Sequence, residues 1–118
     1  MSDKPNSWRL LNSCLLLIAV VPFGAIEVYG ADVAITEQRR QQLIYLVRQD
    51  CGSCHGMTLK GGLGGPLLPG NLDQADREGL AAIILHGVPG KPMPPWDRHL
   101  SKQDALWIAD NLKKGFPW

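Results

Sequence analysis

The sequence predicts a small all-α domain with about three to four helices. Three segments each begin with a residue that caps helix N-termini (Thr36, Asp76 and Ser101) and continue with apolar residues at helical spacing. Stretches rich in glycine and proline separate these segments, and no alternating apolar and polar run is long enough to indicate a strand. A chain of 118 residues has room for one domain of this kind.

The charge balance excludes some classes of partner. The chain has 12 Lys and Arg residues against 11 Asp and Glu residues, a formal net charge of +1, and no block of like charges. Nucleic-acid binding normally needs a strong excess of basic residues. We therefore expect no nucleic-acid partner.

The first 31 residues have the layout of a secretory signal peptide. Lys4 and Arg9 precede the apolar run at residues 14–23, as a positively charged region precedes the apolar region of a signal. A transmembrane helix needs about 20 apolar residues, so this run is too short to be a stable membrane anchor. The sequence therefore predicts export to the periplasm by a cleavable signal at residues 1–31.

Cleavage is expected after Gly30 or Ala31, which leaves a domain of residues 32–118. Of the three cysteines in the chain, only Cys51 and Cys54 belong to that domain. The chemistry of the exported protein is therefore expected to depend on this pair.

The first predicted helix runs from a cap at Thr36 to about Asp50. Leu43, Leu46 and Val47 share one face of it. The helix leads directly into the two cysteines.

The residues Cys51, Cys54 and His55 form the pattern C-x-x-C-H, the attachment sequence of c-type haem. Residues three apart lie on the same face of a helical turn, so both thiols can add to vinyl groups along one edge of a porphyrin. His55 then lies under the iron as its proximal ligand. The motif predicts one covalently bound haem c.

Two other interpretations of the cysteine pair fit the sequence less well. A redox disulfide of the thioredoxin type uses the same spacing, but it belongs to a βαβ context that the sequence lacks. A structural zinc site needs four ligands at paired spacings, and the sequence has no second cysteine pair. The haem interpretation is the stronger one.

Residues 56–70, which follow the motif, are expected to form a loop that wraps closely around the haem, because they are rich in glycine and contain two prolines. A second helix is predicted from a cap at Asp76 to His86, with Gly87 as its stop. Ser101 and Asp104 approximate a capping box for the last helix.

Four residues after the motif are candidates for the second iron ligand. Met93 lies between prolines in residues 89–96, where no helix can form and where a stiff loop can hold a thioether. Met57 is too close to His55 and is expected to be a core or haem-edge residue. His86 is expected to be a cation at a helix end, and His99 is expected to be solvated. Met93 is the predicted distal ligand.

With these motifs in order, residues 33–116 resemble a class I cytochrome c. The resemblance implies a small fold in which the helices wrap around one covalent haem. It also implies that Pro66 packs on the proximal side of the haem, where its carbonyl accepts the Nδ1 proton of His55.

More narrowly, residues 42–67 and the later sequence Met-Pro-Pro-Trp at 93–96 resemble the cytochrome c55X family. These periplasmic cytochromes are encoded with cytochrome cd1 nitrite reductase in denitrifying bacteria. The resemblance implies a one-electron carrier, not an enzyme, whose redox partner is that reductase. The alternative it leaves open is a redox role in the biosynthesis of d1 haem or the maturation of the reductase.

Overall fold

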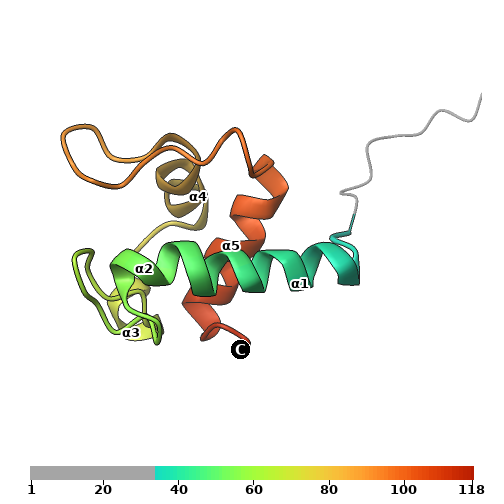
Figure 1. Cartoon of the computed structure of the whole chain (residues 1–118), viewed down its shortest axis with the longest axis horizontal. Helices are drawn as coiled ribbons and strands as arrows, with labels where there is room; N and C mark the ends of the chain where they lie inside the picture. The colour runs from blue at the N-terminus through green and yellow to red at the C-terminus, as the bar shows by residue number, and fades with distance from the viewer. Residues whose placement is uncertain (1–33) are drawn as a thin grey trace, which may run out of the picture. The chain divides into compact units, whose positions relative to one another are not determined.

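The computed structural model describes residues 34–118, and the regular elements in that range are helical. They are α1 (Glu37–Leu46), a π-helical turn (Val47–Cys51), α2 (Gly52–His55), α3 (Pro69–Leu72), α4 (Arg77–His86) and α5 (Lys102–Lys114). Because α1, the π-helical turn and α2 run on as one rod (Figure 1), the described residues form four helices and no strand. The predicted all-α class is confirmed. The predicted signal peptide, residues 1–31, lies outside the described residues.

The long first helix starts where the sequence predicts and changes its hydrogen bonding near its end. The Thr36 hydroxyl accepts a hydrogen bond from the Arg39 amide at 3.2 Å. At the π-helical turn, the Gly52 amide donates to the Val47 carbonyl five residues earlier. The buried Gly52 therefore follows Val47 on the core-facing side of the rod, and Cys51 is left half-buried beside the core. Such turns occur often at functional sites.

The segment after the haem motif is a loop up to Leu68, and the short helix α3 then begins at Pro69. The prediction of a loop over residues 56–70 was therefore wrong for its last two residues. Proline suits the first turn of a helix, because the amide it lacks has no partner within the helix. The Lys113 ammonium group of α5 donates to the Ala75 carbonyl just beyond α3.

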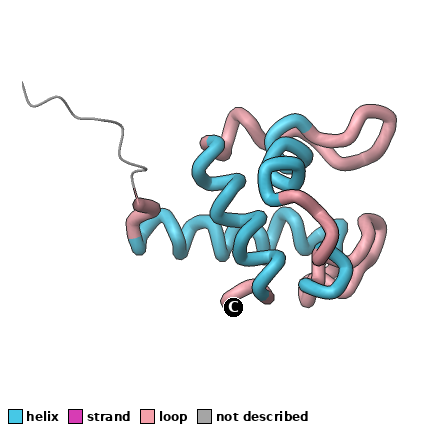
Figure 2. The backbone as a smooth tube through the Cα atoms, turned by 180° about the vertical axis from the view of Figure 1, so that it is seen from behind, coloured by secondary structure: helices cyan, strands magenta, loops and turns pink. Residues whose placement is uncertain are grey.

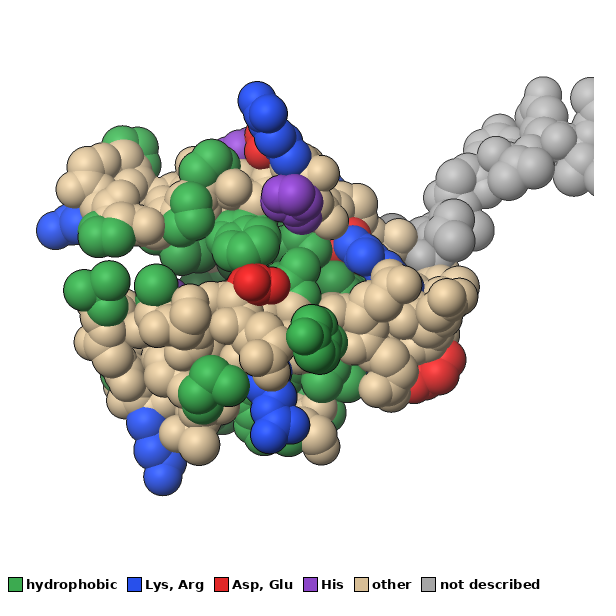
Figure 3. Space-filling view, viewed as in Figure 1, with side chains coloured by type: hydrophobic (Ala, Val, Ile, Leu, Met, Phe, Trp, Pro, Cys, Tyr) green, Lys and Arg blue, Asp and Glu red, His purple; other side chains and the backbone are tan. Residues whose placement is uncertain are grey.

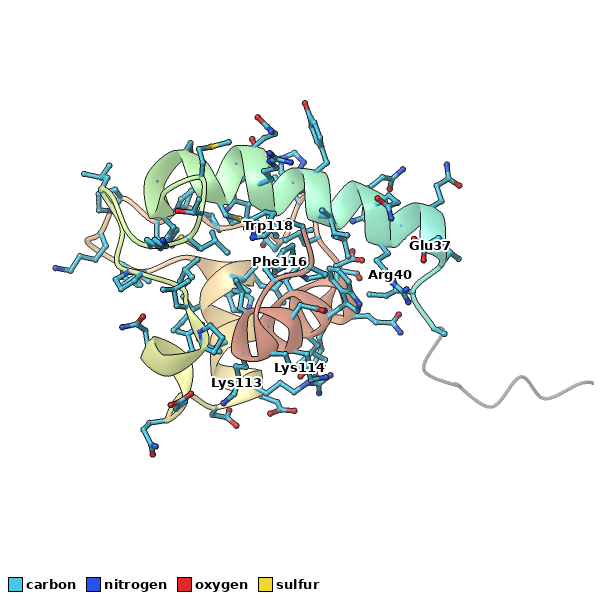
Figure 4. The ribbon with its side chains drawn as sticks, turned by 90° about the horizontal axis from the view of Figure 1, so that it is seen from below. Glu37, Arg40, Lys113, Lys114, Phe116 and Trp118 are labelled. Atoms are coloured by element: carbon cyan, nitrogen blue, oxygen red, sulfur yellow. The ribbon has the colours of Figure 1, made fainter. Side chains whose placement is uncertain are left out.

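The two later helices begin as predicted, and the first of them also ends as predicted. The Asp76 carboxylate accepts from the Gly79 amide at 2.8 Å, and α4 stops before Gly87. At the start of α5, Ser101 and Asp104 form a complete capping box. Figure 4 shows Lys113 and Lys114 at the other end of α5, where their positive charges favour the negative end of the helix dipole.

The core forms where the first helix crosses α5, a crossing that Figures 1 and 2 show from opposite sides. Leu43 and Val47 are fully buried and belong to one apolar cluster with Ile108 of α5. Ala105 and Ala109 of α5 are also fully buried. Their small side chains allow close packing on this face of α5.

An ion pair ties the N-terminal ends of α1 and α5 together. The Arg39 guanidinium donates to both carboxylate oxygens of Asp104, at 3.0 and 2.8 Å, and also to the His99 carbonyl at 3.1 Å. The amide of Ser101 donates to the same carboxylate at 2.9 Å. These bonds hold the pKa of Asp104 below its ordinary value, the Arg39 hydrogen bonds being the largest cause. Among residues 34–118, none of the helices has both the length and the apolar character needed to cross a membrane.

Candidate functional site

An apolar cavity of about 580 Å³ opens between the helices and two loops, residues 56–68 and 87–96. Figure 3 shows the molecule hollowed there, with hydrophobic side chains lining the hollow. The volume lies within the range of about 300–1,000 Å³ that is typical of small-molecule and cofactor sites. Cys51, Cys54, His55 and Met93 all line this cavity. The fold thus gathers two thiols, an imidazole and a thioether around one apolar space.

The two cysteines are presented from the end of the long helix. Both are free thiols and both are half-buried. Burial raises the pKa of the Cys51 thiol to about 11, and the neighbouring Asp50 carboxylate adds to the rise. The Cys51 thiol is therefore neutral at pH 7, which suits its place against an apolar cavity. Within residues 34–118, no cluster of three or more His, Cys, Asp and Glu side chains could hold a metal ion.

His55 is oriented by a backbone carbonyl. Its Nδ1 lies 2.7 Å from the carbonyl oxygen of Gly65. Because a carbonyl only accepts, Nδ1 carries a proton, and in the neutral imidazole Nε2 then keeps the lone pair that a metal ion needs.

The expectation that the Pro66 carbonyl accepts this proton was wrong. The acceptor belongs to the peptide bond that joins Gly65 to Pro66, one residue earlier. Pro66 itself is exposed, and the cavity lining includes Gly65 and Leu67 on either side of it. A proline restricts the backbone of the residue before it, so Pro66 helps to fix the direction in which the Gly65 carbonyl points.

The backbone of the 56–68 loop lies directly against the His55 ring. A Cβ atom added at Gly64 would lie 2.7 Å from both Cε1 and Nδ1 of His55. The loop is bound back to the helix that precedes it, with the Gly64 amide donating to the Cys54 carbonyl at 2.8 Å and the Gly61 amide to the His55 carbonyl at 2.8 Å. The loop thus lies closely against the His55 ring, and its close wrapping around the haem stays a prediction. The roles of Gly64 and Gly65 were missed, and the only signal for them is their position just before Pro66.

The loop that carries Met93 folds back onto the end of α4. The Trp96 amide donates to the Leu85 carbonyl at 3.0 Å, and the Asp97 amide donates to the same carbonyl at 3.1 Å. The last carbonyls of a helix lack partners within the helix. These bonds therefore supply a donor for the Leu85 carbonyl of α4, and they also hold the loop against the helix end. Met93 is half-buried at the cavity.

The other three candidate ligands do not line the cavity. His86 lies at the end of α4, and His99 packs against the ring of Trp96 with centroids 6.1 Å apart; both are exposed, as expected. Met57 is 52% exposed. The expectation that Met57 is a core or haem-edge residue was therefore wrong.

Comparisons with known proteins agree with this arrangement. The family model described as "Cytochrome C oxidase, cbb3-type, subunit III" matches residues 38–111. Cytochrome c55X of Pseudomonas aeruginosa is 42% identical over 115 residues, which cover 98% of this chain and 97% of the relative. Cytochrome c55X of Paracoccus denitrificans is 51% identical over 100 residues, which cover 85% of this chain and 93% of the relative. The chain belongs to the cytochrome c55X family.

Two solved structures resemble this cytochrome. The c-type cytochrome NirC has a TM-score of 0.67 and 50% identity, and the match covers 68% of this chain and 94% of that one. "Dihydro-heme d1 dehydrogenase NirN in complex with DHE" has a TM-score of 0.56 and 33% identity, over 62% of this chain and only 16% of that one. The protein is therefore a c-type cytochrome with covalently bound haem c, and its function is electron transfer with redox partners, not enzymatic catalysis.

Proposed function

We propose that four residues hold the haem of this cytochrome: Cys51 and Cys54 attach it covalently, His55 is the proximal iron ligand, and Met93 is the distal ligand. The observation that supports this assignment is that all four line one apolar cavity. The proton on Nδ1 of His55 and the free lone pair on Nε2 fit the role of a neutral imidazole ligand.

The haem iron supplies a one-electron redox couple. With both His55 and Met93 bound to it, the iron would have no coordination position for a substrate, so the role of this chain would be to exchange single electrons. The apolar lining of the cavity keeps water away from it. A thioether paired with an imidazole favours the ferrous state more than two imidazoles do. Both properties suit a carrier at the oxidising end of an electron-transport chain.

The proposed electron acceptor is cytochrome cd1 nitrite reductase, in denitrification. The cytochrome c55X relatives and the resemblance of residues 42–67 to that family support this partner. Lys91 and Leu63 both line the cavity from different loops, and both are exposed, Leu63 to 79%. Lys60 and Arg48 are exposed too. Exposed basic and apolar side chains of this kind suit a brief encounter that buries less than about 1,200 Å².

A second candidate function is a redox step in the production of d1 haem or the maturation of the reductase. The observation that favours it is the structural similarity to NirN, which is described as a dihydro-haem d1 dehydrogenase. The same bound haem would serve this role, with a biosynthetic enzyme as the partner.

We also propose that residues 1–31 are a cleavable signal peptide and that residues 32–118 work in the periplasm. The support is the charged and then apolar pattern of that segment. The N-terminal residue of the exported protein, determined by mass spectrometry, tests both the cleavage and its position.

The deciding experiment mixes the reduced cytochrome with fully assembled cytochrome cd1 and nitrite in a stopped-flow instrument. The carrier role predicts rapid reoxidation that slows as the salt concentration rises. Lys91→Gln should lower the rate at low salt, whereas Lys114→Gln should not, because Lys114 lies at the end of α5 (Figure 4) and does not line the cavity. A cytochrome that fails to reduce the complete reductase, together with a gene deletion that yields reductase lacking d1 haem, would favour the maturation role.

A further inference from the structure

Gly87 ends α4 in a conformation that only glycine adopts easily. Its φ is +69°, in the left-handed region, and its amide donates to the Ile83 carbonyl at 2.9 Å. Gly87 is also buried. Any other residue at this position would therefore have a strained backbone and little room for its side chain.

The backbone of the Met93 loop lies directly on Gly87. A Cβ atom added there would lie 2.6 Å from the Met93 carbonyl oxygen and 2.9 Å from backbone atoms of both Pro94 and Pro95. Contacts this short force something to move. Because the atoms belong to backbone and two consecutive prolines fix their own φ angles, the loop cannot yield by a side-chain rotation.

The same carbonyl is held from a second side. The Val88 amide donates to the Met93 carbonyl at 3.2 Å. The Met93 carbonyl and side chain belong to the same residue. The contacts that Gly87 and Val88 make with this carbonyl therefore also determine how far the thioether reaches into the cavity.

We propose that Gly87 is a positioning residue for the Met93 thioether. Because Gly87 has no side chain, the backbone of residues 93–95 packs directly on the end of α4, in the position from which the Met93 sulfur can bind iron. The inference rests on the proposed function, in which Met93 is the distal ligand. It goes further by placing control of that bond on a residue that does not line the cavity.

Gly90 provides a matched control in the same loop. Its φ is +73°, nearly the same as that of Gly87, but a Cβ atom added there meets nothing within 4 Å. Both positions have a positive φ that is unfavourable for alanine, and only alanine at position 87 collides with the loop. The Gly90 variant therefore controls for a positive φ in this loop, and a larger effect at position 87 is expected from the collision.

The experiment compares the oxidised holoproteins of the wild type, Gly87→Ala and Gly90→Ala. The wild type and Gly90→Ala should show the weak red sulfur-to-iron charge-transfer band, and Gly87→Ala should lose most of it. Added imidazole should bind Gly87→Ala at least about tenfold more tightly than wild type, because its apparent affinity follows the fraction of protein with an open distal position. For Gly90→Ala the change should stay within about twofold.

A normal band and normal imidazole affinity in Gly87→Ala would overturn the inference. Equal losses in the Gly87 and Gly90 variants would also overturn it, because they would assign the effect to backbone strain. The proposed function is tested separately: Met93→Ala must lose the band even if Gly87→Ala keeps it. A wild type without the band would contradict both proposals.

If Gly87→Ala fails to accumulate, the substitution is combined with Pro94→Ala and Pro95→Ala, which let the loop backbone yield. The reference is then the protein with the two proline substitutions alone. Tighter imidazole binding in the triple variant would support the inference, and equal binding in the two proteins would contradict it.

Discussion

The loops on the two sides of the cavity hold their candidate ligands differently. His55 is the last residue of α2, and the loop of residues 56–68 only supports it, through the Gly65 carbonyl and the close backbone of Gly64. Met93 lies within its own loop, between the end of α4 and Trp96. The candidate proximal ligand is thus carried by a helix next to both cysteines, whereas the position of the candidate distal ligand depends on how a loop packs.

This difference predicts two kinds of failure. Damage on the proximal side removes the attachment or the ligand that the helix presents, so it threatens the haem and the core together. Damage on the distal side releases one bond to iron and leaves the attachment intact. The four predictions that follow test this contrast, from the largest expected effect to the smallest.

The largest effect is expected from the double substitution Cys51→Ala with Cys54→Ala. Without attachment, a cavity of about 580 Å³ is left without its haem, and cofactor binding supplies part of the folding free energy. The variant should not accumulate in the exported fraction, as measured by immunoblot.

The matching control uses the wild type. Its intact mass should show one added haem, and the colour should stay with the protein in acidified acetone. Haem that is extracted by this solvent would contradict covalent attachment.

The next effect is expected from Met93→Ala, which breaks only the distal side. The protein should accumulate with haem, lose the red charge-transfer band and gain high-spin features in its visible spectrum. Met57→Ala is the control, because Met57 is 52% exposed and does not line the cavity. A band that survives Met93→Ala would show that another residue binds the iron.

A smaller change is expected from Gly64→Ala, which presses on the proximal ligand without removing it. The new Cβ would lie 2.7 Å from His55 Nδ1 and weaken the bond to the Gly65 carbonyl. Loss of that bond makes the imidazole a poorer donor and raises the reduction potential. A redox titration should show that the reduction potential rises on the order of tens of millivolts. For a one-electron couple, a tenfold change in the equilibrium constant corresponds to about 59 mV.

Gly65→Ala is the control for this prediction, because a Cβ atom at Gly65 meets nothing within 4 Å and its carbonyl is kept. Its potential should match that of the wild type. Equal shifts in both variants would mean that the loop tolerates no side chain at either position and that the His55 contact is not the cause.

The smallest effect on the haem is expected from Asp104→Asn, because Asp104 does not line the cavity. At pH 7 the loss of the ion pair with Arg39 should lower the free energy of unfolding by about 1–3 kcal/mol. The pKa of Asp104 is lowered in the folded state, so its carboxylate stabilises the fold above its unfolded pKa of about 3.9, and this contribution disappears as the pH falls through the folded value.

Chemical denaturation at several pH values measures this effect. The difference between the wild type and Asp104→Asn should shrink as the pH falls below about 4, and the visible spectrum of the folded protein should not change. Asp110→Asn is the control: its ion pair with Arg77 is more exposed and should contribute less to stability than the Arg39–Asp104 pair. An equal loss in both variants would show that the burial of Asp104 has no effect.

The element boundaries were largely predictable because they depend on nearest neighbours in the chain. Asp76 and the pair Ser101 and Asp104 bond to amides within three residues, and Gly87 stops α4 at the next position. The change to π-helical hydrogen bonding at Val47 has no such local signal. It arises where the long helix packs against α5.

The sequence by itself determined the helix caps and the four candidate haem residues, because each depends on the chemistry of a side chain and its spacing along the chain. Only the tertiary structure decided that the acceptor for His55 is Gly65 and not Pro66, and that Gly64 and Gly87 are the close contacts behind the two ligands. At Gly64 and Gly65 the backbone lies close to the His55 ring, and at Gly87 it lies close to the backbone of residues 93–95. These contacts depend on distances of a few tenths of an ångström between folded segments, which the order of residue types does not specify.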